Sequence, residues 1–271
     1  MYKEFFGLKE KPFNVTSDPS FLYLSRVHKE AFSHLLYGIR ERKGFLEITG
    51  EVGAGKTTLC RALLNQLDVN TKSAFIFNST LPEMQLFEAI LEDYGVIIGR
   101  RNKVAMLKQL NNFLIEELSK NNNVILIIDE AQNLKLSILE EIRMLSNLET
   151  DKQKLFQIIL VGQPELKAKL ESPSLKQLRQ RIAVRFHITP LEKDEVAGYI
   201  DHRLTVAGSS GQIRFDPDAV DFIYKYTGGI PRIINMVCDK ALLAAYVMET
   251  RDVRLSMVER SVQELEGLVT V

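Results

Sequence analysis

Short apolar runs alternate with longer amphipathic segments between residues 28 and 161. The runs have the length and the β-branched character of strands, and the segments between them repeat apolar positions every three or four residues, as helices do. The strands expected from this pattern are residues 45–48, 73–77, 124–128 and 156–161. The expected helices are residues 28–42, 56–67, 86–94, 104–119 and 136–148. The alternation predicts an α/β fold in which helices sandwich a parallel sheet.

The pattern changes near Pro190, after which the sequence predicts helices alone. These helices are expected at residues 193–207, 216–226, 231–249 and 256–265, with Asp216 and Ser256 as N-caps. The first 25 residues are aromatic-rich and are expected to be irregular, because Pro12 and Pro19 interrupt any helix. We therefore predict an α/β domain of residues 1–190 and a small all-helical domain of residues 191–271.

The amino-acid composition disfavours several classes of protein. Lys and Arg total 35, Asp and Glu also total 35, and the formal charge is zero, which disfavours a surface devoted to coating nucleic acid. The two cysteines lie far apart and fit neither a zinc site nor a disulfide framework, as expected in a reducing compartment. The sequence has no apolar stretch of 18 residues and no signal peptide pattern. We predict a cytoplasmic protein with no membrane span.

The strongest motif follows the first expected strand. Residues 50–57 match G-x-x-x-x-G-K-[ST] between a strand and a helix, where backbone N–H groups cradle phosphates. Lys56 is expected to reach the β- and γ-phosphates, and the Thr57 hydroxyl to bind Mg²⁺. A chance glycine-rich turn is the alternative, which the flanking strand and helix disfavour. The expected nucleotide-binding residues are Gly50, Glu51, Val52, Gly53, Ala54, Gly55, Lys56, Thr57 and Thr58.

A second acidic motif ends the apolar run at residues 124–128. Ligands of open α/β sheets lie beyond the carboxyl ends of the strands, so Asp129 is expected to bind Mg²⁺, directly or through water. Glu130 fits the group that polarises the attacking water during phosphoryl transfer. The alternative is that these carboxylates cap the following helix.

Polar amides follow two other expected strands. Gln163 could orient the attacking water or contact the γ-phosphate, although a glutamine before a proline is often an ordinary loop residue. Asn78 could hydrogen-bond Glu130 and regulate it, and a role in a turn is equally consistent with its position.

These residues together resemble the AAA+ ATPases, and more closely the ExeA/GspA/MshM group associated with type II secretion and MSHA-type pilus assembly. The stretches that carry the resemblance are YKEFFGLKEKPF at 2–13, FLYL at 21–24, HKEA at 28–31, DEAQ at 129–132 and IILVGQPEL at 158–166. The resemblance implies ATP with Mg²⁺, ATP hydrolysis, self-assembly into a hexamer or filament, and secretion or pilus assembly proteins as partners. It also implies an association with the inner membrane through partners.

The resemblance adds site residues. It places Tyr23 and His28 beside the adenine, and makes Arg232 the lid arginine that contacts the γ-phosphate. Residues 178–186 resemble the stretch that supplies an arginine finger to a neighbouring subunit. Arg181 and Arg185 are four apart and would share one face of a helix. With several lysines nearby, a basic surface for nucleic acid or an acidic partner is a rival interpretation, and a solvated helix face is the plain one.

Longer secretion members continue into a membrane span and a periplasmic peptidoglycan-binding domain, whereas this sequence ends at Val271. It is expected to be a shorter member or a piece of a longer protein. Three functions compete: an ATPase that drives or regulates secretion or pilus assembly, an ATP-dependent DNA-binding regulator resembling the MuB/TnsC transposition ATPases, and a nucleotide switch with little turnover. Glu130 favours hydrolysis over the switch, because a switch would not need that carboxylate.

Overall fold

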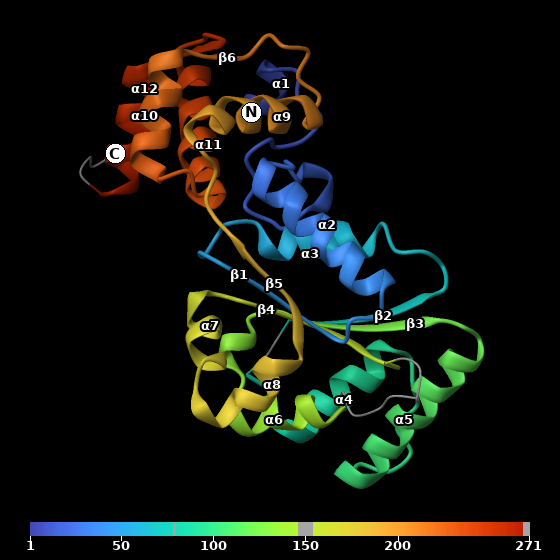
Figure 1. Cartoon of the computed structure of the whole chain (residues 1–271). Helices are drawn as coiled ribbons and strands as arrows, with labels where there is room; N and C mark the ends of the chain where they lie inside the picture. Colours follow the sequence, from blue (N-terminus) through green and yellow to red (C-terminus); the bar gives the residue numbers. More distant parts are fainter. Residues whose placement is uncertain (78–79, 146–153, 268–271) are drawn as a thin grey trace. The chain divides into compact units, whose positions relative to one another are not determined.

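The computed structural model describes residues 1–77, 80–145 and 154–267 of the chain. They form two compact units, which are described one at a time (Figure 1). The sheet unit consists of Lys29–Val52 and Leu59–Ile188. The helical unit consists of Met1–His28, Gly53–Thr58 and Thr189–Val271. Packing thus groups the N-terminal segment and the glycine-rich loop with the C-terminal helices, and the domain division at residue 190 stays a prediction.

The described part of the sheet unit contains a five-stranded parallel sheet in the order β2-β3-β4-β1-β5, which confirms the predicted α/β class. Its strands are β1 (Phe45–Gly50), β2 (Thr71–Ile76), β3 (Asn123–Ile128), β4 (Gln157–Gly162) and β5 (Ile182–Ile188). In the central strands β3, β4 and β1 nearly every residue is buried, because helices cover both faces. Strand β5 was not predicted: its exposed Arg185 and His187 interrupt the apolar run that would have identified it.

Helices cover the sheet of this unit on two faces (Figure 1). They are α2 (Arg26–Arg40), α3 (Lys56–Leu64), α4 (Glu83–Asp93), α5 (Lys103–Ser119), α6 (Leu136–Leu145), α7 (Pro164–Leu170) and α8 (Lys176–Arg181), with short 3₁₀ turns η2 (Ala131–Asn133) and η3 (Pro173–Leu175). Alternate strand residues such as Leu126 and Leu160 form one core with α4–α8. On the other face Gly38 of α2 lies against Leu46 and Val184. Part of the expected helix at 136–148 falls outside the described residues.

Gly50, at the end of β1, has a steric requirement. A β-carbon there would lie 2.5 Å from the carbonyl oxygen of Ile188 on β5, closer than atoms can approach. Because residue 50 is glycine, the edge strand β5 can pair with β1 as far as Gly50, where the glycine-rich loop leaves the sheet.

The helical unit contains α1 (Tyr2–Phe5), η1 (Pro19–Phe21), α9 (Lys193–Val206), α10 (Pro217–Thr227), α11 (Pro231–Val247) and α12 (Leu255–Leu265). The expectation of helices alone after residue 190 is wrong, because β6 (Arg214–Phe215) pairs in parallel with β7 (Asp252–Val253). Asp216 is the N-cap residue of α10, as expected. Ser256 is not a cap, since α12 begins one residue before it and has Arg254 at its N-cap.

The N-terminal segment is held in the core of this unit by its aromatic rings and by Arg203. Phe6, Phe13 and Phe21 are buried. The Arg203 guanidinium donates to the carbonyl oxygens of Pro12, at 2.5 Å, and of residue 14, at 3.0 Å, and it lies 4.7 Å from the centre of the Phe21 ring. A buried guanidinium satisfied by backbone carbonyls thus fixes a segment that is largely without regular structure.

Candidate active site

The glycine-rich loop lies in the helical unit over Gly53–Thr58 and leads into α3, which begins at Lys56. Gly53 and Gly55 have φ angles of +80° and +94°, a left-handed conformation that other residues rarely adopt. This conformation lets successive backbone N–H groups face one side at a helix N-terminus, which is the geometry of an anion-binding nest. The loop therefore has the backbone form that its sequence predicted for phosphate binding.

The ring of His28 contacts this loop directly. Its Nε2 lies 2.9 Å from the carbonyl oxygen of Ala54, and its Nδ1 lies 2.7 Å from the Ser25 hydroxyl oxygen. Because a carbonyl can only accept, Nε2 carries a proton; in the neutral ring, Nδ1 then accepts from the Ser25 hydroxyl. Burial lowers the pKa of His28, although the hydrogen bond to Ala54 opposes this shift. A position of His28 beside the adenine stays a prediction; its contact here is with the phosphate loop.

Arg232 is the second residue of α11 and also meets the loop. Its backbone N–H donates to the carbonyl oxygen of Gly53 at 3.2 Å. A β-carbon on Gly53 would lie 2.5 Å from the Arg232 β-carbon. The helical unit therefore packs α11 against the start of the loop so closely that only glycine fits at residue 53. The predicted contact of the Arg232 side chain with a γ-phosphate stays a prediction.

Tyr23 lies in the same unit, against α9. Its ring packs edge-on against Tyr199 with centroids 5.9 Å apart, and its hydroxyl lies 2.9 Å from where a β-carbon of Gly198 would be. Burial raises the pKa of Tyr23, and the carboxylates of Glu195 and Asp194 add to the shift. These contacts are with protein, and the expected role of Tyr23 at the adenine stays a prediction.

In the sheet unit, the carboxyl end of β3 positions both acidic residues. The backbone N–H of Asp129 donates to Ile76 at the end of β2, at 2.9 Å, and the Glu130 N–H donates to the Asp129 carboxylate, also at 2.9 Å. Glu130 has φ 52° and ψ 35°, a left-handed conformation. Asp129 is buried and its oxygen atoms are the donor type that Mg²⁺ prefers, so its chemistry fits the expected metal role.

Two glutamine amides hold the Glu130 carboxylate. Gln163, directly after β4, donates from Nε2 to Glu130 Oε2 at 2.9 Å, and Gln132 donates to the same oxygen at 2.5 Å. Sequence reasoning identified Gln163 but missed Gln132, although it lies in the DEAQ stretch that carried the family resemblance. Asn78, the other amide predicted to contact Glu130, lies outside the described residues.

The predicted residues therefore gather in two groups. Strands β1, β3 and β4 are parallel neighbours in the order β3-β4-β1, so the residues after them occupy one edge of the sheet. That edge brings together Gly50, Glu51, Val52, Asp129, Glu130 and Gln163. The helical unit brings together Gly53, Ala54, Gly55, Lys56, Thr57, Thr58, His28 and Arg232.

The two candidate finger arginines do not share a helix face, which corrects the sequence interpretation. Arg181 is the last residue of α8, whereas Arg185 lies on β5, because the apolar alternation of residues 182–188 is that of a strand. Arg181 is half-buried, and its Nη1 lies 3.5 Å from the carbonyl oxygen of Arg143. The two side chains therefore leave the chain from different elements in different surroundings.

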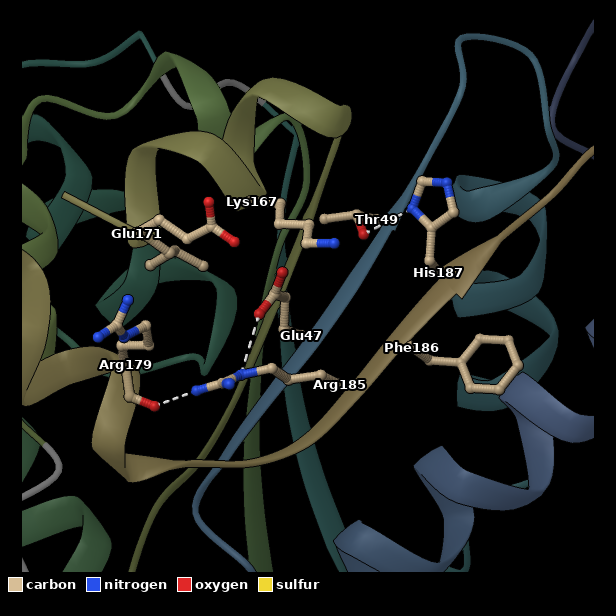
Figure 2. Close-up of a pocket in the computed structure, with 9 residues that line it drawn as sticks. Glu47, Thr49, Lys167, Glu171, Arg179, Arg185, Phe186 and His187 are labelled. Carbon is tan, nitrogen blue, oxygen red and sulfur yellow. Dashed lines mark hydrogen bonds and ion pairs between the residues drawn. The ribbon is translucent and has the colours of Figure 1, made fainter.

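Arg185 lines a pocket of about 380 Å³ beside β1 and β5 (Figure 2). Its Nε lies 3.5 Å from the buried carboxylate of Glu47, and its guanidinium also donates to the Arg179 carbonyl. Burial raises the pKa of Glu47, while the charges of Arg185 and Lys167 oppose that shift. Arg185 is thus engaged by its own subunit at the rim of a pocket that holds both signs of charge.

Comparison with known proteins agrees with this fold. The AAA domain family matches residues 39–170. Among solved structures of similar fold, the Aeropyrum pernix ORC2 protein has a TM-score of 0.72 at 18% identity, covering 94% of this chain and 72% of that one. Cdc6p of Pyrobaculum aerophilum has a TM-score of 0.67 at 17% identity, covering 90% and 70%. The Thermotoga maritima RuvB branch migration motor has a TM-score of 0.55 at 17% identity, covering 88% and 68%.

The fold and the phosphate loop define this chain as a P-loop ATPase of the AAA class, as the sequence predicted. A curated relative then narrows the assignment: General secretion pathway protein A of Aeromonas hydrophila is 41% identical over 269 residues, which are 99% of this chain and 49% of that protein. The chain resembles the ExeA/GspA family of AAA ATPases over almost its whole length, and it spans about half the length of the curated relative that it matches. In the described residues, no helix has both the length and the apolar character needed to cross a membrane.

Proposed function

We propose that this chain is a Mg²⁺-dependent ATPase that self-assembles and uses ATP hydrolysis to drive or regulate assembly of a secretion or pilus apparatus. The observation that carries the hydrolytic part is the Glu130 carboxylate, held by Gln163 at the carboxyl edge of a sheet whose strand β1 leads into a phosphate loop. The 41% identity to General secretion pathway protein A supports a role in secretion. A cytoplasmic location with contact to the inner membrane through partners completes the proposal.

The predicted catalytic, phosphate-binding and metal-binding residues have the following roles in this proposal. Lys56 and the backbone N–H groups of the loop hold the β- and γ-phosphates, and the Thr57 hydroxyl and Asp129 hold Mg²⁺. The metal ion would neutralise charge that develops on the phosphate oxygens. Glu130 polarises the attacking water, and Gln163 orients it. Arg232 contacts the γ-phosphate from the helical unit, and Arg181 or Arg185 serves a neighbouring subunit.

The test is an ATPase assay at several protein concentrations, with two variants. Lys56→Ala should lose ATP binding, and Glu130→Gln should bind ATP but lose at least about 100-fold in rate. Lys108→Ala and Glu41→Gln remove an exposed lysine and an exposed glutamate elsewhere, and should behave as wild type. Normal ATP binding by Lys56→Ala would refute the cradle, and a normal rate for Glu130→Gln would refute the role of that carboxylate.

A rate per subunit that rises with protein concentration is expected if subunits complete one another's sites. A constant rate would refute the self-assembly part of the proposal. The same assay with duplex DNA addresses the alternative of a DNA-binding regulator, for which a solved structure of similar fold, the Aeropyrum pernix ORC1 protein in complex with DNA, provides a reason to look. Strong, salt-sensitive stimulation by DNA would favour that alternative; we expect none, since the net charge is zero.

A further inference from the structure

Gln132, in the 3₁₀ turn after β3, closes a ring of hydrogen bonds around Glu130. Its amide nitrogen donates to Glu130 Oε2 at 2.5 Å, and its amide oxygen accepts from the backbone N–H of Gln163 at 3.1 Å. The side chain of Gln163 donates to the same Glu130 oxygen at 2.9 Å. Gln132 therefore contacts both the Glu130 carboxylate and Gln163, the other residue that donates to this carboxylate.

The surroundings of Gln132 fix this side chain. A β-carbon on Gly162 would lie 2.8 Å from Gln132 Oε1, so the end of β4 is glycine where the amide passes. Lys169 of α7 donates to the main-chain carbonyls of Gln132 and, at 2.9 Å, of Leu134. Strand β4 and helix α7 thus hold both the side chain and the backbone of the turn, which leaves little freedom for the amide to leave Glu130.

The backbone at Glu130 is a second unusual feature of this residue. Its left-handed conformation costs about 1–2 kcal/mol for a residue with a β-carbon. Strained residues of this kind persist where the surroundings over-determine them, and they cluster at active sites. The unfavourable conformation and the two amide donors act on the same residue.

We propose that Gln132 is a positioning residue: it holds the Glu130 carboxylate in its working orientation and couples that orientation to Gln163. This inference rests on the proposed role of Glu130 in hydrolysis. Two donors on one oxygen restrict rotation of the carboxylate and fix where its second oxygen points. Removal of the Gln132 amide leaves Glu130 with one of these two donors, and a carboxylate misplaced by about 1 Å can lower a rate by about 100-fold.

The experiment measures kcat, the ATP dissociation constant and thermal stability for Gln132→Leu and Gln132→Glu. Leucine matches the size of the amide but has no hydrogen-bonding groups, and glutamate keeps an acceptor for the Gln163 N–H while it places a second carboxylate beside Glu130. Both are expected to lower kcat by about 10- to 100-fold with ATP affinity within about twofold of wild type. Gln85→Leu, at an exposed position of α4, is the control and should keep the wild-type kcat.

A double-mutant cycle separates positioning from a structural role. In the Glu130→Gln background, whose residual rate is measured at high protein concentration, Gln132→Leu should lower the rate by less than about twofold, because members of one catalytic unit are not additive. An equal loss in both backgrounds would overturn the inference, and so would a wild-type kcat for Gln132→Leu while Glu130→Gln is inactive. If Glu130→Gln itself keeps the wild-type rate, the proposed function fails instead.

Discussion

The His28 ring donates a hydrogen bond over 2.9 Å to the carbonyl oxygen of Ala54, in the middle of the phosphate loop. The Ser25 hydroxyl oxygen lies 2.7 Å from the other ring nitrogen, so a hydroxyl, an imidazole and a loop carbonyl form one chain of hydrogen bonds. This contact gives His28 a clear structural role, since it restrains the loop from the side of the N-terminal segment.

Replacement of His28 by glutamine should weaken ATP binding by about 10-fold, because the phosphate loop loses the imidazole that restrains it. A tenfold loss of affinity corresponds to about 1.4 kcal/mol. The measurement is titration with a fluorescent ATP analogue. His34→Gln is the control, since His34 is half-exposed and on the same helix α2. Equal affinity of wild type and His28→Gln would show that the loop keeps its shape without this contact.

The same variant should change how stability depends on pH. Burial lowers the pKa of His28 below its ordinary value of 6.5, so the unfolded chain takes up the proton before the folded chain does. The contribution of neutral His28 to stability is therefore complete above pH 6.5 and is lost as the pH falls through the lowered folded value. Urea unfolding at pH 7.5 and 5.5 should show a smaller loss for His28→Gln than for wild type. An identical loss in both proteins would contradict the buried neutral imidazole.

A comparison of two glycines with similar backbone conformations distinguishes backbone strain from steric clash. Gly53 and Gly211 have φ angles of +80° and +83°, but a β-carbon at 53 would meet the Arg232 side chain, whereas one at 211 would meet nothing within 4 Å. Gly211→Ala should cost about 1 kcal/mol of unfolding free energy from backbone strain alone. Gly53→Ala should cost more and should also abolish ATP binding, as measured by denaturant unfolding and nucleotide titration. Equal costs with intact ATP binding would show that Arg232 can move away freely.

The contribution of the buried Glu47 carboxylate to stability should depend on pH in the opposite direction to that of His28. Burial raises its pKa above the ordinary value of 4.5, so its contribution to stability is complete below pH 4.5 and is lost as the pH rises through the raised folded value. Glu47→Gln should therefore leave stability at pH 7.5 within about 1 kcal/mol of wild type, because the half-exposed Arg185 can return to water. On acidification wild type should gain relative to the variant.

Urea unfolding at pH 7.5 and 5.5 checks this expectation, with Glu41→Gln as the control because that carboxylate is exposed and does not line the pocket. A loss of about 3–5 kcal/mol at pH 7.5 would instead identify the pair of Glu47 and Arg185 as an essential buried salt bridge.

The proposed finger can be tested by mixing two inactive variants. Arg181→Ala keeps its own Glu130, and Glu130→Gln keeps its own Arg181, so an equal mixture should recover about a quarter of the wild-type rate if the arginine acts on a neighbour. The readout is ATP hydrolysis at high protein concentration. No recovery above the sum of the separate variants would exclude action of Arg181 in trans. The same mixture with Arg185→Ala in place of Arg181→Ala tests the other candidate arginine.

The sequence by itself determined the class of fold and the class of enzyme. Buried parallel strands such as residues 124–128 must be almost wholly apolar, and a phosphate loop needs glycines before Lys56, so both leave local patterns that a reader can recognise. The acidic pair after β3 and the amide after β4 could be predicted to lie at the same edge of the sheet, because the carboxyl ends of parallel strands share one edge.

Tertiary structure alone decided the contacts between segments far apart in the chain. Strand β5 pairs with β1 at the edge of the sheet, where one side stays exposed and charged residues hide the pattern. Gln132 meets Gln163 across 31 positions, and His28 meets Ala54 across 26. Periodicity records which face of an element is buried, but it carries no information about which distant side chain a polar group will meet. The partners of His28, Gln132 and Arg185 are therefore set by the tertiary structure alone.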